Sequence, residues 1–184
     1  MRIEATDLAG VHVVDMEPTF DERGFSAEIF NREAFAALGL RPHLEHASLA
    51  FTPTLGTLRG LRWQMAPSRA ARLVRVVRGR VFDVVVDVRA ESPSFGCWRG
   101  FELSAREGRA VYVPEGCAHG YLTLEDDVFV LHQASERSRP ELARHLRWDD
   151  PDVGVEWPLA PRVQARAELE AAAWLRDLAP RRVA

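Results

Sequence analysis

The stretch AVYVPEGCAHGY, residues 110–121, carries the pattern Pro-x-Gly-x-x-His at Pro114, Gly116 and His119. Its apolar start predicts a strand that ends at Pro114, because proline has no amide hydrogen to donate to a sheet. A Glu-Gly turn then precedes a second predicted strand that begins at His119. The pattern thus predicts two strands joined by a tight turn with a histidine at the entry to the second. A histidine that is only hydrogen-bonded at a turn is the alternative interpretation.

Short strands separated by turn residues continue on both sides of this stretch. The turns recur at roughly ten-residue spacing, which is typical of β-sandwiches and barrels. A helix is predicted over 31–39, where Asn31 suits the N-cap and Gly39 suits the position after the last turn. A second helix over 163–179 is expected to pack outside the barrel. The predicted strands cover residues 11–17, 46–51, 57–64, 71–79, 81–89, 97–103, 110–116, 119–125 and 128–135.

Composition limits the classes of function. The chain has 184 residues, of which 47% are hydrophobic, and a formal net charge of −3. We therefore expect one domain over residues 1–184, and neither a nucleic-acid nor a membrane partner. We find no signal peptide and no apolar run of ~20 residues, which predicts a cytoplasmic protein. All basic residues except histidine are arginine, so no lysine can act as a base or form a Schiff base.

The Pro-x-Gly-x-x-His pattern resembles the second motif of the cupin barrels. In metal cupins this histidine is a ligand, and the other ligands come from an H-x-H…E motif on earlier strands. Here the corresponding strand, GTLRGLRWQ (56–64), offers Arg62 and Gln64 instead. Arginine stays protonated and cannot ligate a metal. Cys97 and Cys117 also lack zinc-ligand spacing. We therefore predict no catalytic metal and no cofactor.

The arginines of GTLRGLRWQ have two interpretations. Because side chains alternate along a strand, Arg59 and Arg62 should point to opposite faces, and one or both could be solvated. Gly60 lies between them and would permit a β-bulge. Such a bulge would turn both arginines toward the same side of the sheet.

Several long stretches together resemble one family, the dTDP-4-dehydrorhamnose 3,5-epimerases, which are metal-independent cupins. The resemblance runs from about residue 11 to residue 161. It implies a mostly β fold, a cupin or double-stranded β-helix (jelly-roll) barrel with a few peripheral helices. The matching stretches are FDERGFSAEIFN, GTLRGLRWQMAPSRAARLVRVVRG, VFDVVVDVRAESPSFGCWRGFELS, VYVPEGCAHGYLTLEDD and LRWDDPDVGVEWPL.

The resemblance also implies an isomerase. Family enzymes bind a nucleotide-linked 4-keto-6-deoxysugar in the barrel and move protons at the carbons next to the ketone. This chemistry needs a base of near-neutral pKa, a group that stabilises the enolate oxygen, and an acid on the opposite face. In the family, a histidine held by an aspartate is the base and a tyrosine is the acid.

Many binding positions of the family have a plausible counterpart in this chain. Arg72 stands where the family has a phosphate-binding lysine, which keeps the charge and adds donors. Trp63 and Gln64 lie beside the expected site. The substrate-binding residues that we expect are Phe20, Arg23, Glu28, His46, Ser48, Arg59, Trp63, Gln64 and Arg72. Phe25 could complete an apolar wall beside Phe20.

The reactive positions differ from the family. The base histidine falls at Arg62, and the tyrosine acid falls at His132. The orienting aspartate falls near Ala167, and the aromatic that stacks on thymine falls near Ser138. Arginine is a poor base because its pKa of about 12.5 or higher keeps it charged, but it is a good electrostatic clamp for an enolate or a phosphate.

Proton transfer would then pass to histidine, whose intrinsic pKa is about 6.5. His132 is the first candidate, His119 the second and His46 the third. The alternative for His132 is a hydrogen-bonded core histidine. The catalytic residues that we expect are therefore His132, His119 and Arg62.

Three hypotheses about function remain open from the sequence. The first is an epimerase or isomerase of a dTDP-4-keto-6-deoxyhexose with an altered active site. The second is the same scaffold used for a different natural-product substrate. The third is a non-catalytic protein that binds sugar nucleotides. By the same resemblance we expect a homodimer in which the N-terminal strand and the Arg23 region join the sheet of the partner.

Overall fold

The computed structural model describes residues 1–178 and is built almost entirely from β-strands. The strands are β1 (Arg2–Ala5), β2 (His12–Asp15), β3 (Thr19–Asp21), β4 (Gly24–Ser26), β5 (His46–Thr52), β6 (Leu58–Gln64), β7 (Arg72–Arg78), β8 (Arg80–Asp87), β9 (Trp98–Ser104), β10 (Ala110–Val113), β11 (Cys117–Thr123), β12 (Val128–Ala134), β13 (Ala143–Leu146) and β14 (Ala172–Ala173). The helices are short: α1 (Arg32–Ala37), α2 (Arg166–Glu170), α3 (Leu175–Leu178) and the 3-10 turn η1 (Pro140–Leu142).

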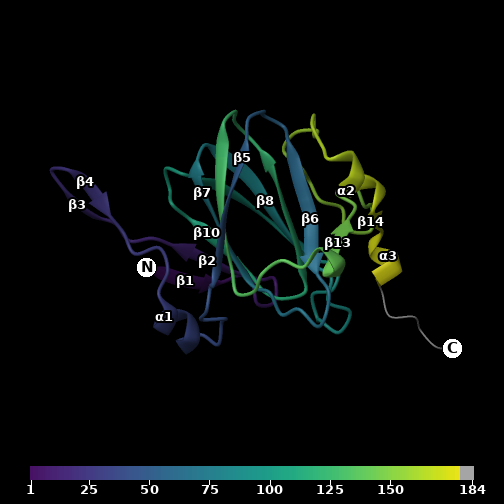
Figure 1. The fold of residues 1–184 in the computed structure, drawn as a ribbon, viewed down its shortest axis with the longest axis horizontal. Helices are drawn as coiled ribbons and strands as arrows, with labels where there is room; N and C mark the ends of the chain where they lie inside the picture. Colours follow the sequence, from purple (N-terminus) through teal and green to yellow (C-terminus); the bar gives the residue numbers. More distant parts are fainter. Residues whose placement is uncertain (179–184) are drawn as a thin grey trace.

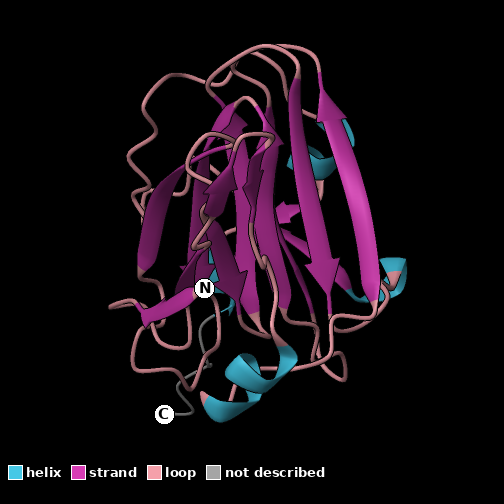
Figure 2. Ribbon diagram, turned by 90° about the vertical axis from the view of Figure 1, so that its left-hand side faces the viewer, coloured by secondary structure: helices cyan, strands magenta, loops and turns pink. Residues whose placement is uncertain are grey.

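Two six-stranded sheets face each other and form the barrel that the sequence predicts. One sheet has the order β1-β2-β10-β7-β12-β5, and the other has the order β14-β13-β6-β11-β8-β9. From β5 to β8 and again from β9 to β13, sequential strands alternate between these two sheets. Every strand pairing except that of β13 with β14 is antiparallel. The helices lie at the periphery (Figure 2). The hairpin β3–β4 extends away from the barrel (Figure 1).

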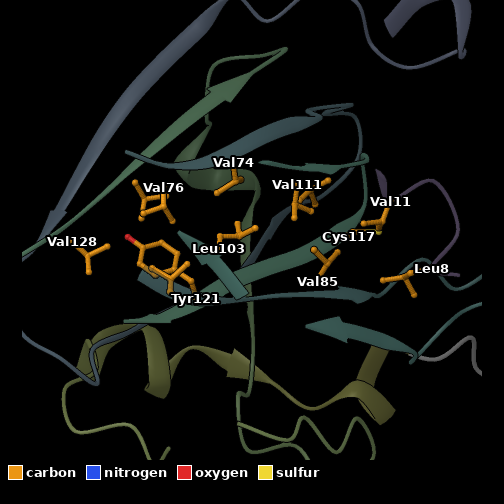
Figure 3. Packing of buried hydrophobic residues seen from close by; sticks show 13 residues of the cluster. Leu8, Val11, Val74, Val76, Val85, Leu103, Val111, Cys117, Tyr121 and Val128 are labelled. Atoms are coloured by element: carbon orange, nitrogen blue, oxygen red, sulfur yellow. The ribbon is translucent and has the colours of Figure 1, made fainter. Parts of the chain in front are cut away.

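A core of β-branched side chains fills the space between the two sheets. Val74, Val76 and Val111 of one sheet pack against Val85 and Leu103 of the other, all at most 1% exposed. Tyr121 lies among these residues (Figure 3). Side chains alternate along a strand, so every second residue of these strands faces this core.

Two smaller clusters cover the outer faces of the sheets. Helix α1 begins at Asn31, whose side-chain oxygen accepts from Ala34 N as predicted, and it buries Phe35 against one sheet. The C-terminal segment covers the other sheet, where Leu175 packs beside Trp63 and Leu61. No helix within residues 1–178 is long and apolar enough to cross a membrane.

The prediction of one continuous helix over 163–179 is wrong for the described residues. That segment forms two short helices, α2 and α3, separated by β14. Ala172 and Ala173 pair in parallel with His145 and Leu146 of β13. Tertiary strand pairing therefore overrides the helix propensity of the alanine-rich segment. Residue 179 lies outside the described residues.

Candidate active site

A cavity of about 380 Å³ opens at one end of the barrel, between β5, β6, β7, β11 and β12. Its wall carries four arginines, three histidines and two glutamates. The volume falls within the range of small-molecule sites. The polar residues on this wall are His46, Ser48, Arg59, Arg62, Gln64, Arg72, His119, Tyr121, His132, Glu136, Arg137, Ser138 and Glu168.

A bulge in β6 brings Arg59 and Arg62 to the same cavity. His119 pairs with Arg62 and Tyr121 pairs with Arg59, so two residues of β6 oppose the single Gly120 of β11. Gly60 takes a φ of 109°, which L side chains rarely adopt. A Cβ on Gly60 would lie 2.6 Å from Gly120 Cα and from His119 O. Glycine is therefore required for the bulge that the sequence made possible.

The cavity arginines have no carboxylate partner within ion-pair distance among residues 1–178. Arg59 donates from Nε to Thr52 Oγ1 at 3.0 Å and from Nη2 to Phe51 O at 3.1 Å, which fixes its guanidinium. Arg72 donates from Nη1 to the Arg62 carbonyl oxygen at 3.3 Å. Burial, with the charge of Arg62, lowers the pKa of Arg72 to about 10. This cation cluster is suited to bind an anion such as a diphosphate.

Gln64 supplies a free hydrogen-bond donor beside these charges. Its side chain is only 5% exposed. Its Oε1 accepts from Arg139 N at 2.8 Å, while Nε2 is buried with no partner among the described residues. A buried donor without a partner is costly, so its presence on a cavity wall indicates a place where a polar ligand group can be bound.

His119 forms a buried pair with Asp83 of the neighbouring strand β8. His119 Nε2 lies 2.7 Å from Asp83 Oδ2, and the two side chains are 4% and 0% exposed. Because a carboxylate only accepts, Nε2 carries the hydrogen and Nδ1 keeps its lone pair. This is the arrangement of a histidine that is oriented by a carboxylate. The carboxyl partner was missed in the sequence, although an aspartate in the apolar run VFDVVVDV was a signal for it.

His132 lies between His119 and Tyr121 on the cavity wall. Its ring centroid is 6.0 Å from that of His119 and 6.1 Å from that of Tyr121, with which it stacks. Burial, the neighbouring His119 and the cavity arginines together lower the pKa of His132 to about 3. The ring is therefore neutral at pH 7, and it has no excess proton to donate as an acid.

The lowered pKa of His132 predicts a specific pH dependence of stability. Because the ordinary pKa of 6.5 applies to the unfolded chain and the folded value is about 3, the unfolded state binds more protons between these values. The free energy of unfolding should therefore fall as the pH is lowered from about 7 toward 4, by on the order of 1 kcal/mol per pH unit from this group. Urea unfolding of His132→Gln at each pH should give a shallower curve than the wild type.

The exposed His43 provides the control for that comparison. His43→Gln should follow the wild-type curve, because the His43 side chain is exposed and lies outside the cavity. Curves for wild type and His132→Gln that run parallel from pH 7 to pH 4 would contradict the assignment of a buried neutral ring.

Four of the expected binding residues do not line this cavity in the single chain. Trp63 points to the outer cluster beside Leu61, because it lies one residue from Arg62 and from Gln64 on an alternating strand. Phe20 lies on the extended hairpin β3–β4, Arg23 lies at its turn and Glu28 follows it. Arg23 pairs there with Asp21.

Other cavity residues were missed in the sequence. Tyr121 and Arg137 were not selected, and neither was Glu168 of α2, next to Ala167. Tyr121 could have been found from its spacing of two from His119 on a strand. Among residues 1–178, no cluster of three or more histidine, cysteine or acidic side chains could hold a metal ion.

The chain is similar to proteins of known activity along nearly its whole length. A family model described as dTDP-4-dehydrorhamnose 3,5-epimerase matches residues 5–174. The dTDP-4-dehydrorhamnose 3,5-epimerase of Methanothermobacter thermautotrophicus is 39% identical over 158 residues, which cover 86% of this chain and 84% of that protein.

Solved structures agree with the sequence comparison. A 4-keto-6-deoxy sugar epimerase from the novobiocin biosynthetic gene cluster of Streptomyces spheroides superimposes with a TM-score of 0.89 at 30% identity, over 96% of this chain and 88% of that one. The dTDP-6-deoxy-D-glucose-3,5-epimerase of Legionella pneumophila Philadelphia 1, in complex with dTDP-4-keto-L-rhamnose, has a TM-score of 0.88 at 30% identity, over 100% and 99% of the two chains.

A jelly-roll barrel with an arginine- and histidine-lined cavity at its open end is a small-molecule-binding barrel of the cupin class. Its close superposition on solved epimerases places it within an enzyme class, the isomerases. The chain belongs to the dTDP-4-dehydrorhamnose 3,5-epimerase family. The family assignment and the fold expected from the sequence are confirmed.

Proposed function

We propose that the protein is an epimerase or isomerase of a dTDP-linked 4-keto-6-deoxyhexose, and that it moves a proton at a carbon next to the keto group. The observation that carries the proposal is the cavity in which Arg59, Arg62 and Arg72 meet His119 and His132. Arginines bind a diphosphate, and histidines on the same wall can transfer protons.

Arg62 has the role of a charge stabiliser in this proposal. Its guanidinium is exposed to the cavity and has no ion-pair partner among residues 1–178. When a proton leaves the carbon next to the ketone, negative charge develops on the ketone oxygen. A cation at that oxygen lowers the barrier because it stabilises the negative charge that develops there. His46 and Ser48 line the same cavity and are proposed to contact the substrate.

Thermal-shift measurements test the substrate class. Because a ligand that binds only the folded state stabilises it, dTDP and dTDP-glucose at 100 times Kd should raise the free energy of unfolding by about 2.7 kcal/mol. UDP-glucose provides the matched control for the base. No shift with any dTDP compound would contradict the proposal and favour the same scaffold acting on a different natural-product substrate.

We also propose that two copies of the chain form a dimer. The hairpin β3–β4 leaves Phe20 72% exposed and Phe25 59% exposed, and it projects from the barrel (Figure 1). The strand β5 is at a sheet edge with Leu49 58% exposed and Phe51 46% exposed. Exposed aromatic side chains on an arm and an unpaired edge both favour a partner.

Phe20, Arg23 and Glu28 do not line the cavity of their own chain. In a dimer they could bind substrate in the cavity of the partner. Sedimentation analysis should give twice the 20.7 kDa of one chain, and Phe20→Ser should weaken the association. A stable monomer at micromolar concentration would contradict the dimer. A cytoplasmic location remains our expectation.

A further inference from the structure

The three histidines on the cavity wall have different surroundings. His46 is exposed on the edge strand β5 and has no acidic partner among residues 1–178. His132 is surrounded by cations, namely Arg59, Arg62 and Arg72. His119 alone of the three is hydrogen-bonded to a carboxylate. These differences separate the histidines by the chemistry that each can perform.

We propose that His119, oriented by Asp83, is the base that removes the proton from the substrate, and that it acts through Nδ1. The inference rests on the proposed function and deepens it, because it assigns the proton transfer to one ring nitrogen. His119 would be the catalytic residue and Asp83 a positioning residue. His132 would contact the substrate as a neutral hydrogen-bonding side chain.

The hydrogen bond to Asp83 determines which nitrogen is free. Nε2–H donates to Asp83 Oδ2 at 2.7 Å, so the lone pair resides on Nδ1, which makes no hydrogen bond to any described residue. His119 lines the cavity, although only 5% of its surface is exposed. Nδ1 is thus the free hydrogen-bond acceptor of a ring that borders the cavity where the substrate would bind.

Asp83 also favours the charge that forms on the ring during the reaction. It is fully buried, and its Oδ1 has no partner among residues 1–178. A carboxylate attracts a positive charge that forms at hydrogen-bond distance. When His119 accepts a proton, the imidazolium forms at hydrogen-bond distance from this carboxylate. His132 lacks this stabilisation, because its neighbours are His119 and arginines.

The proposed step balances without any co-reactant except water. The C–H bond next to the ketone breaks, and its proton forms an N–H bond on His119 Nδ1. The electron pair moves into the enolate, whose oxygen faces the cavity cations. Return of a solvent-exchanged proton from the imidazolium to the same face regenerates the substrate with solvent hydrogen at that carbon. Protonation of the opposite face by water gives the epimer, and the imidazolium then loses its proton to the hydroxide that is left. In both cases the enzyme regains its starting protonation state.

Deuterium incorporation into a dTDP-4-keto-6-deoxyhexose in heavy water tests this assignment. The wild type is measured first, followed by His119→Gln, Asp83→Asn and His132→Gln. Loss of general base catalysis should slow exchange in His119→Gln by about 10³-fold, while its affinity for dTDP stays within a few-fold. The loss in His132→Gln should be at least tenfold smaller. Asp83→Asn should lower kcat with little change in KM, because it misorients the ring without altering the binding wall.

Chemical rescue separates a base from a structural residue. Imidazole added to His119→Gly should restore part of the exchange, with a pH profile that follows free imidazole. A purely structural histidine would not give this profile. The solvent-exposed His43→Gln is the matched control and should exchange at the wild-type rate. If His119→Gln no longer binds dTDP, the decision rests on the rescue, and its absence overturns the assignment.

The outcomes for this inference and for the proposed function differ. If the wild type catalyses exchange and the exchange rate of His119→Gln is within tenfold of the wild-type rate, the role of His119 is overturned. The proposed function then remains intact. A wild type that binds dTDP without any exchange overturns both. If His132→Gln loses exchange while His119→Gln retains it, the role of base would be assigned to His132 instead.

Discussion

Arg62→Met is expected to slow deuterium exchange of the ketosugar by about 100-fold, while the affinity for dTDP falls less than tenfold. The reason is that Arg62 would act on the charge of the enolate, and removal of one such donor typically costs a factor of about 10² to 10³ in kcat. The substitution removes only the guanidinium, because the bond from Arg72 goes to the backbone oxygen of residue 62. Steady-state exchange rates and calorimetric titration with dTDP measure the two effects separately.

Graded variants make this prediction sharper. Arg62→Lys keeps the charge but loses the planar fork, so its exchange rate should lie between those of the wild type and Arg62→Met. Arg78 provides the matched control, because it is 65% exposed at the end of β7 and does not line the cavity. Arg78→Met should exchange at the wild-type rate. An Arg62→Met protein with unchanged exchange would show that Arg62 is only a solvated strand charge.

Gly60→Ala should lower the free energy of unfolding by about 3 kcal/mol and should weaken dTDP binding as well. The added methyl would lie 2.6 Å from two backbone atoms of β11, and neither His119 O nor Gly120 Cα can move independently of the sheet. The φ of 109° adds backbone strain. Relief of the clash would shift β6 against β11, and Arg59 and Arg62 would leave their common face.

Gly39 is the matched control for the steric part of this effect. It also has a positive φ, 70°, but nothing lies within 4 Å of the position that its Cβ would take. Gly39→Ala should therefore cost only the backbone term of about 1 kcal/mol. Equal losses of stability in the two variants, measured by urea unfolding, would show that close approach of β6 to β11 does not require glycine.

The sequence predicted the barrel well because the signals for its strands are local. The alternation of apolar residues and the regular turns identified nine of the strands, and the N-cap Asn31 gave the start of α1 correctly. Gly60 permitted a bulge but could not require it, since alternation favoured opposite faces for Arg59 and Arg62. The deciding factor is the close approach of Gly120 on another strand, which no local pattern contains.

The site was predicted in part, for similar reasons. The family resemblance named His119, His132, Arg59, Arg62 and Arg72 as site residues. All five line the cavity. The partner of His119 is 36 residues away in the chain, and only the pairing of β8 with β11 brings Asp83 to it. The low pKa of His132 comes first from burial of its ring, and then from His119 and from arginines of two other strands. Such electrostatic properties follow from the assembled barrel.

Solvent exchange by the unmodified protein tests the central claim, that this cavity moves a proton next to a carbonyl even though the family resemblance predicts Arg62 at the position of the family base. The protein is incubated with a dTDP-4-keto-6-deoxyhexose in heavy water, and the sugar is followed by NMR at the carbons that flank the ketone. Enzyme-dependent deuterium at one or both carbons is the predicted result. Saturation of the cavity by the ketosugar, without deuterium above the uncatalysed background, would contradict the account and identify a sugar-nucleotide-binding protein.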